Sequence, residues 1–283
     1  MTQSIDVEES ANKISSIIDR INEAVIAERD FLEIVLTGFL ARGHVLLEDV
    51  PGTGKTLTAV AMGDALGLSY NRIQFTPDLL PSDITGSHVY DEQAGAFKFQ
   101  QGPVFSNIVL ADEINRAPPK TQSALLEAMD EGQVTVGGDT YDLPDPFFVI
   151  ATQNPIEQEG TFRLPEAQRD RFVVKTSMGY PERDGELELI KRRSDRTTMM
   201  PTVDSVVDEK EVTTLRQLPE SIVMEDSVRE YLVDLARTSR EDDRVEVGIS
   251  PRAIQRFFEA AQRRDVGGIV RVPLASGLLT GKY

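Results

Sequence analysis

Cysteine is absent from this 283-residue chain, and histidine and long apolar runs are scarce. Without cysteine the chain cannot form disulfides or thiolate metal sites, so a reducing cytoplasm is the compartment that we expect. His44 and His88 are the only histidines, too few to favour a histidine-based metal centre. No stretch approaches the ~20 consecutive apolar residues of a membrane span, and the polar, acidic residues 1–10 do not resemble a secretory signal.

Positive charge is in deficit. The chain has 30 Lys and Arg against 47 Asp and Glu, a formal net charge of −17. Binding to phosphates needs clustered cations, so this balance argues against a nucleic-acid partner and against docking on an anionic membrane surface. Only 8 of the cations are lysine. Many carboxylates with little lysine are typical of proteins from salt-loving microbes, but an ordinary acidic cytoplasmic protein fits the composition equally well.

The hydrophobic period changes along the chain. Apolar residues recur at helical spacing in residues 14–25 and 32–40, which predicts two helices before residue 43. Short apolar runs then alternate with helical patterns, which predicts an α/β fold with a parallel sheet. The predicted strands are residues 44–48, 70–75, 107–111 and 147–151, the predicted helices run from 55 to about 66 and from 118 to 129, and a hairpin is predicted over 134–143.

Only helical patterns follow residue 180. They cover residues 182–193, 208–218 and 228–236. Ser250-Pro251 predicts the start of one more helix, because serine caps a helix N-terminus and proline suits its first turn. The C-terminal part is therefore predicted to be a small all-helical domain.

Residues 49–56, DVPGTGKT, lie between a predicted strand and a predicted helix, as a phosphate-binding loop does. The glycines let backbone N–H groups converge on a phosphate beside the helix N-terminus. Lys55 is expected to neutralise the β- and γ-phosphates, and the Thr56 hydroxyl to ligate Mg²⁺. The strict pattern has glycine where this chain has Asp49. The residues expected to contact the nucleotide are Asp49, Val50, Pro51, Gly52, Thr53, Gly54, Lys55, Thr56 and Leu57.

Polar residues follow two further predicted strands. Asp112 and Glu113 come directly after the apolar run 108–111, where the ends of parallel strands border a ligand crevice. Asp112 is expected to hold Mg²⁺, directly or through water, and Glu113 to polarise the attacking water as general base. Asn154 follows the run 147–151 and could orient that water, although Asn-Pro is also a common turn signal.

Together these residues resemble the AAA+ ATPases, and more closely the MoxR type. The strings that carry the resemblance are HVLLEDVPGTGKT at 44–56, FTPDLLPSDITG at 75–86, ADEINRA at 111–117, ATQNP at 151–155 and LPEAQRDRF at 164–172. The resemblance covers residues 10 to 265, approximately. It implies an AAA+ P-loop core at 43–180 whose parallel sheet is sandwiched by helices. N-terminal helices at 1–42 would pack on that core, and a helical lid would span 181–268.

The resemblance also assigns roles. It implies that Asn154 is sensor 1, that Arg171 is an arginine finger reaching the neighbouring subunit's γ-phosphate, and that Arg252 is sensor 2 on the lid. The family has an apolar residue where this chain has Arg169, so the choice between Arg169 and Arg171 as the trans-acting group stays open. The cofactors implied are ATP and Mg²⁺. The assembly implied is a homo-oligomer, a hexameric ring, acting chaperone-like on a protein client such as a von Willebrand factor A domain protein.

Two inserts follow the family pattern, and the C-terminus departs from it. The insert between Tyr70 and the predicted strand at 107–111 resembles the helix-2 insert, and residues 134–143 resemble the hairpin before sensor 1. In the family, both usually lie near the pore of the ring. Residues 269–283 depart from the family pattern. Residues 272–283 resemble a short aldo/keto reductase segment, with no barrel or catalytic tetrad around it. We interpret this tail as a fusion, frameshift or truncation.

Two other functions fit the same motifs. One is the motor subunit of a chelatase-like AAA+ enzyme. The other is a nucleotide-gated regulatory protein that binds ATP without turnover, although intact Lys55, Asp112 and Glu113 argue against it. A replicative helicase is disfavoured by the charge of −17 and by the lack of Lys and Arg in residues 134–143.

Overall fold

A computed structural model describes residues 7–50, 52–155, 161–195, 201–221, 225–245, 248–251 and 253–255. Pro51, Arg252 and the tail at 269–283 lie outside these residues, so the expectations for them stay predictions. Among the described residues, no helix combines the length and the apolar character needed to cross a bilayer.

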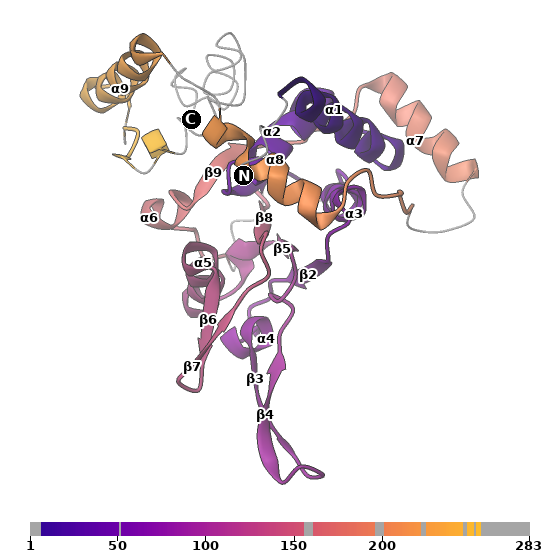
Figure 1. Ribbon diagram of the computed structural model, residues 1–283, viewed down its shortest axis with the longest axis vertical. Coiled ribbons are helices and arrows are strands. Elements are labelled where there is room, and N and C mark those ends of the chain that lie inside the picture. Colours follow the sequence, from indigo (N-terminus) through magenta and orange to yellow (C-terminus); the bar gives the residue numbers. More distant parts are fainter. Residues whose placement is uncertain are drawn as a thin grey trace.

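The centre of the fold is a five-stranded parallel sheet (Figure 1), as the sequence predicts. Its strands are β1 (His44–Glu48), β2 (Tyr70–Gln74), β5 (Ile108–Asp112), β8 (Phe148–Gln153) and β9 (Phe172–Thr176). Their order is β2-β5-β8-β1-β9, and each neighbouring pair runs parallel. Strand β9 was not predicted, because its apolar residues give way to Lys175 and Thr176 at the sheet edge.

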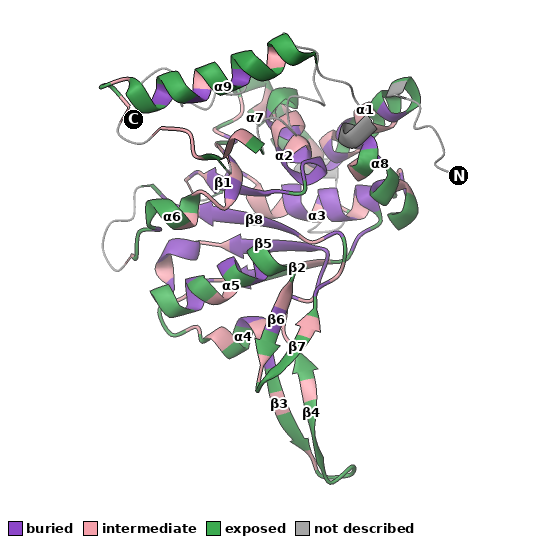
Figure 2. Ribbon diagram, turned by 60° about the vertical axis from the view of Figure 1, so that its left-hand side comes forward, coloured by how far each residue is buried: buried purple, intermediate pink, exposed green. Residues whose placement is uncertain are grey.

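Apolar side chains alternate between the two faces of the sheet and build two cores. Ile108 and Leu110 belong to one buried cluster, and Val109 and Ala111 belong to the other. Helices α1 (Val7–Ala24), α2 (Arg29–Leu40) and α3 (Lys55–Leu66) cover the first face, and α5 (Pro119–Glu131) covers the second (Figure 2). Because both faces are covered, the central strands carry continuous apolar runs rather than alternating ones.

Two hairpins extend from this core. The predicted hairpin at 134–143 is confirmed as β6 (Gln133–Val136) and β7 (Asp139–Asp142). Beside it, after the short helix α4 (Pro81–Thr85), β3 (Gly86–Asp91) and β4 (Ala96–Gln101) form a hairpin that projects far from the sheet (Figure 1). The sequence did not predict this second hairpin, because most of its residues are exposed on both faces and leave no clear apolar period.

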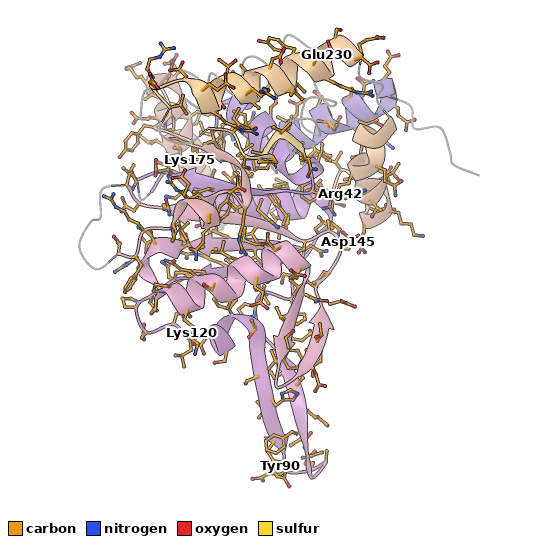
Figure 3. All side chains as sticks on the ribbon, turned by 90° about the vertical axis from the view of Figure 1, so that its left-hand side faces the viewer. Arg42, Tyr90, Lys120, Asp145, Lys175 and Glu230 are labelled. Carbon is orange, nitrogen blue, oxygen red and sulfur yellow. The ribbon has the colours of Figure 1, made fainter. Side chains whose placement is uncertain are left out.

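Stacked rings join the two hairpins at their base. The rings of Phe99 and Tyr141 stack with their centroids 3.9 Å apart. The Tyr141 hydroxyl lies 3.2 Å from Nε2 of His88. The projecting hairpin is therefore fixed at its base. Its far end carries the exposed Tyr90 (Figure 3), whose ring packs against the exposed Phe97.

Short helices and the C-terminal helices complete the described chain. They are a 3₁₀ turn at Ile114–Arg116, α6 (Glu166–Arg169), α7 (Arg183–Asp195), α8 (Glu209–Ser221) and α9 (Asp226–Glu241). Ser250 caps a further helical turn as predicted, since its Oγ accepts a hydrogen bond from the Ala253 N–H at 3.0 Å. The boundary near residue 181 stays a prediction.

Helix α8 packs on the core rather than standing apart from it. Val212 and Leu215 are buried in the same cluster as α1, α2 and α3. Arg216 of α8 donates to Asp145 at 2.8 Å and lies over the Phe39 ring of α2, 5.5 Å from its centroid. Residues 201–221 therefore contribute to the same apolar layer as the N-terminal helices.

We predict that Leu215→Ala lowers the free energy of unfolding by roughly 2–5 kcal/mol, because Leu215 is 3% exposed and its loss leaves a cavity. The matched control is Leu187→Ala on α7, which is 50% exposed and should change stability by about 0.5 kcal/mol or less. Urea unfolding followed by circular dichroism measures both. Equal, small effects would contradict the packing of α8 on the core.

Candidate nucleotide site

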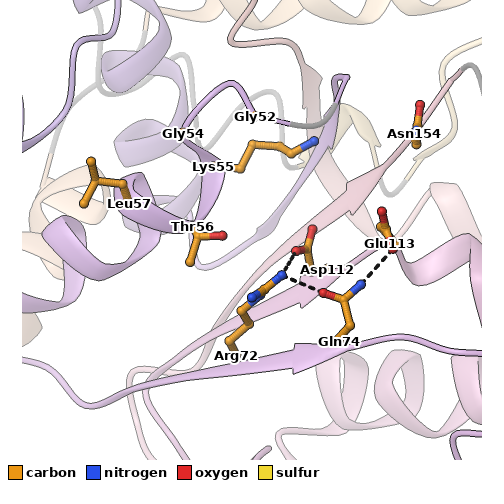
Figure 4. Close-up of a pocket in the computed structure, with 10 residues that line it drawn as sticks. All are labelled: Gly52, Gly54, Lys55, Thr56, Leu57, Arg72, Gln74, Asp112, Glu113 and Asn154. Atoms are coloured by element: carbon orange, nitrogen blue, oxygen red, sulfur yellow. Dashed lines mark hydrogen bonds and ion pairs between the residues drawn. The ribbon is translucent and has the colours of Figure 1, made fainter. Parts of the chain in front are cut away.

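A cavity of about 430 Å³ lies at the carboxyl ends of the sheet strands (Figure 4). Residues from the loop after β1, from β2, and from the ends of β5 and β8 meet there, as the topology of a parallel sheet requires. The lining residues are Gly52, Gly54, Lys55, Thr56, Leu57, Arg72, Gln74, Asp112, Glu113 and Asn154. The structure thus brings Lys55, Glu113 and Asn154 together from three separate segments.

The loop between β1 and α3 has the backbone conformation that its glycines permit. Gly52 and Gly54 have φ of 88° and 104°, in the region that disfavours side chains, and Gly54 is the N-cap of α3. Nζ of Lys55 donates to the carbonyl oxygens of Asp49 at 2.9 Å and Val50 at 3.2 Å. The ammonium is therefore held at the entrance of the loop, next to the first turn of α3. Thr53 is buried.

The two carboxylates at the end of β5 are held by neutral and positive groups. Oδ1 of Asp112 accepts a hydrogen bond from the Thr152 hydroxyl at 2.6 Å, and Oδ2 accepts one from Arg72 at 2.5 Å. Oε2 of Glu113 accepts from Gln74 at 2.8 Å and from Arg116 at 3.0 Å. Glu113 also has φ of 57°, a strained conformation for a residue other than glycine and a frequent feature of functional sites.

Arg72 and Gln74 are site residues that the sequence analysis missed. They lie two apart on β2, so they point to the same side of the strand and reach the same cavity. Arg72 donates hydrogen bonds to both Asp112 and Gln74, and Gln74 in turn donates one to Glu113 (Figure 4). The signal that could have identified them is the pair of polar residues two apart on the predicted strand at 70–75, which pairs with the strand that ends at Asp112.

The two candidate trans-acting arginines lie outside this cavity. Arg171 donates to the Leu126 carbonyl oxygen of α5 at 2.6 Å and pairs with Asp130 at 2.9 Å. Arg169 pairs with Glu166 on its own helix at 3.1 Å. The structure therefore brings neither arginine to the phosphate loop of its own chain. Their action in trans stays a prediction, as does the role of Arg252.

The donors in the cavity suit a hard divalent cation beside a nucleotide. Mg²⁺ prefers oxygen ligands, and proteins bind it through one or two side chains together with substrate phosphates. The Asp112 carboxylate and the Thr56 hydroxyl both line the cavity and supply such oxygens. In the part of the chain that the structure describes, His, Asp and Glu nowhere gather in threes that could hold a metal by protein ligands alone.

A glycine-bent loop between strand β1 and helix α3, with carboxylates at the end of β5, which β8 separates from β1 in the sheet, defines a P-loop nucleoside-triphosphate fold. Residues 44–174 match the family model described as ATPase family associated with various cellular activities (AAA). YeaC of Bacillus subtilis is 47% identical over 245 residues, 87% of this chain and 76% of YeaC. Chaperone MoxR1 of Mycobacterium tuberculosis is 40% identical over 254 residues, 87% of this chain and 67% of that protein.

A solved structure agrees with these sequence relatives. The crystal structure of a candidate ATPase from Cytophaga hutchinsonii superposes with a TM-score of 0.82 at 39% identity, over 90% of this chain and 80% of the other. The chain belongs to the MoxR-type AAA+ ATPase family.

We predict that Lys55→Ala abolishes stabilisation by nucleotide, because the variant lacks the cation of the loop that is expected to bind the phosphates. For the unchanged protein, the ATP analogue ATPγS with Mg²⁺ at about 100 times its Kd should raise the unfolding free energy by about 2.7 kcal/mol. Differential scanning calorimetry measures the shift in Tm. Lys98→Ala, on the exposed hairpin, is the control and should keep the full shift. An equal shift in all three proteins would contradict a phosphate role for Lys55.

We predict that Gln74→Ala lowers kcat for ATP hydrolysis by about tenfold or more, because a hydrogen bond to a charged group is worth about 1.5–3 kcal/mol. The Kd for ATPγS should stay nearly unchanged, since Gln74 holds Glu113 rather than the loop. Turnover assays and calorimetric titration measure the two quantities. An unchanged kcat would show that Gln74 does not position Glu113.

Proposed function

We propose that this protein is a Mg²⁺-dependent ATPase that works as a motor in a homo-oligomeric ring and remodels or activates a partner protein complex. The observation that carries the proposal is the single cavity in which Lys55, Asp112, Glu113 and Asn154 meet. The intact set of charged groups favours turnover over a purely regulatory binding role.

The residues of the cavity divide the work of phosphoryl transfer to water. The backbone N–H groups of the loop and Lys55 bind the β- and γ-phosphates of ATP. Glu113 accepts the proton of the attacking water, and Asn154 orients that water toward the γ-phosphorus. Thr56 and Asp112 would hold Mg²⁺, which supplies neutralisation of charge on the phosphate oxygens. The products are ADP and inorganic phosphate.

The position of Arg171 supports the need for a neighbouring subunit. Arg171 pairs with Asp130 in the last turn of α5 and does not line the cavity of its own chain. An arginine finger supplied in trans stabilises transition-state charge and raises turnover by about 10³–10⁵. We therefore propose that adjacent chains in a ring, hexameric as in the family, complete each other's sites with Arg171.

The projecting hairpins support a protein client. The end of the β3–β4 hairpin carries Tyr90, far from the core (Figure 3), and Phe97 pairs with it on the opposite strand. These side chains are 53% and 69% exposed. One relative, MoxR1, is named a chaperone. We propose a chaperone-like role with a client that is a protein, such as a von Willebrand factor A domain protein, and not a nucleic acid, given the net charge of −17.

We predict that two inactive variants restore activity when mixed. Glu113→Gln keeps Arg171 but lacks the general base, whereas Arg171→Ala keeps Glu113 but lacks the finger. In a mixed ring, an Arg171→Ala subunit beside a Glu113→Gln subunit regains a complete site, so phosphate release should rise well above either variant alone. The measurement is phosphate release across mixing ratios at fixed total chain.

Arg169→Ala in place of Arg171→Ala is the matched control. Arg169→Ala should keep near-normal turnover alone, because this variant retains Arg171; it removes only the pair of Arg169 with Glu166 on the same helix. If the mixed Arg171→Ala and Glu113→Gln chains co-assemble by native mass spectrometry and stay inactive, the trans role of Arg171 is wrong. If Arg169→Ala is inactive alone and regains activity when mixed with Glu113→Gln, while Arg171→Ala keeps near-normal turnover, the arginine finger is Arg169.

A further inference from the structure

Asp49 stands where the strict phosphate-loop pattern has glycine, and its side chain has a defined set of partners. It is 4% exposed. Oδ1 accepts hydrogen bonds from the Ser177 hydroxyl at 2.8 Å and the Gly179 N–H at 3.0 Å, and Oδ2 accepts one from the Met178 N–H at 2.7 Å. The carboxylate thus ties the entrance of the loop to residues 177–179, which we call the strap.

The strap also contacts the far side of the phosphate loop. Met178 is buried, and its Sδ lies 3.9 Å from the Thr58 hydroxyl of α3. A Cβ placed on Gly54 would lie 3.5 Å from Cε of Met178, so the strap and the loop are in close apposition. The strap directly follows β9 and leads through Tyr180 toward α7. It therefore joins the sheet to the C-terminal helices.

The main chain of Asp49 is bound by the residue that meets the nucleotide. Its carbonyl oxygen accepts a hydrogen bond from Nζ of Lys55 at 2.9 Å. A charge-assisted bond to phosphate is roughly twice as strong as one to a neutral carbonyl, so a bound β- or γ-phosphate draws the ammonium away from Asp49. Nucleotide binding would therefore remove the hydrogen bond from Lys55 to the Asp49 carbonyl oxygen, while the Asp49 carboxylate stays bound to the strap.

We propose that Asp49 is a positioning residue that links occupancy of the phosphate loop to the position of the strap, and through the strap to the C-terminal helices. This proposal rests on the proposed ATPase function. Asp49 acts through Lys55 on one side and through residues 177–179 on the other, and it is not among the residues that line the cavity. The Asp49 side chain thus connects the loop entrance to a segment that lies 128 to 130 residues further along the sequence.

The test uses a fluorophore placed beside the strap. The chain has no tryptophan, and Tyr180 is 72% exposed next to Gly179, so Tyr180→Trp introduces a single reporter. Adding ATPγS and Mg²⁺ should change the emission of that reporter. In Tyr180→Trp with Asp49→Asn, most of the emission change should be lost, because the charged carboxylate no longer holds residues 177–179 to the loop. The Kd for ATPγS is measured separately by calorimetry.

Two further variants separate the link from loss of structure. Ser177→Ala removes one donor and leaves the carboxylate, so it should reduce the emission change partially, and its effect should not add to that of Asp49→Asn. Ser106→Ala removes a buried hydroxyl that accepts a hydrogen bond from Asn71 at 2.8 Å away from the cavity, and it should keep the full emission change.

The outcomes distinguish this proposal from the proposed function. If ATPγS binds and the emission responds equally with Asp49 and with asparagine at that position, or does not respond in the parent, the link is overturned while the ATPase proposal stands. If ATPγS does not bind the parent, both fall. If Asp49→Asn does not fold, Ser177→Ala decides: an undiminished response overturns the link.

Discussion

Burial of the central strands between two apolar layers is the constraint on which the rest of the structure depends. Strands β5 and β8 are packed by helices on both faces, so their register and their ends are fixed by close packing. The polar residues that follow each strand are therefore delivered to one edge of the sheet. Strand packing alone therefore brings Asp112, Glu113 and Asn154 to the loop that carries Lys55.

The sequence predicted the parts of the fold with a strong period. Continuous apolar runs identified three of the five sheet strands, β1, β5 and β8, and β2 was predicted at 70–75 although it lacks such a run. The glycine-rich loop with its flanking strand and helix identified the phosphate site. Strand β9 was missed because its short apolar run gives way to Lys175 and Thr176 at the sheet edge. The β3–β4 hairpin was missed because it lies mostly in solvent, where no buried face imposes a pattern. Tertiary placement, rather than local sequence, decides such segments.

The candidate site was predicted in its acidic and loop residues but not in the residues that hold them. Arg72 and Gln74 are polar residues on a strand with exposed positions, so their sequence suggests only a solvated surface. Their contacts with Asp112 and Glu113 arise from the neighbouring register of β2 and β5. The partners of Asp49 were likewise invisible, because residues 177–179 reach it only through the pairing of β1 with β9.

The central claim is that this chain hydrolyses ATP in a site completed by a second copy. The most direct measurement is ATP turnover per chain as a function of protein concentration, in high KCl with Mg²⁺. The account predicts that specific activity rises steeply with concentration and is absent from Glu113→Gln at every concentration. Nucleotide binding without turnover at any concentration would contradict it, as would a specific activity that does not depend on concentration.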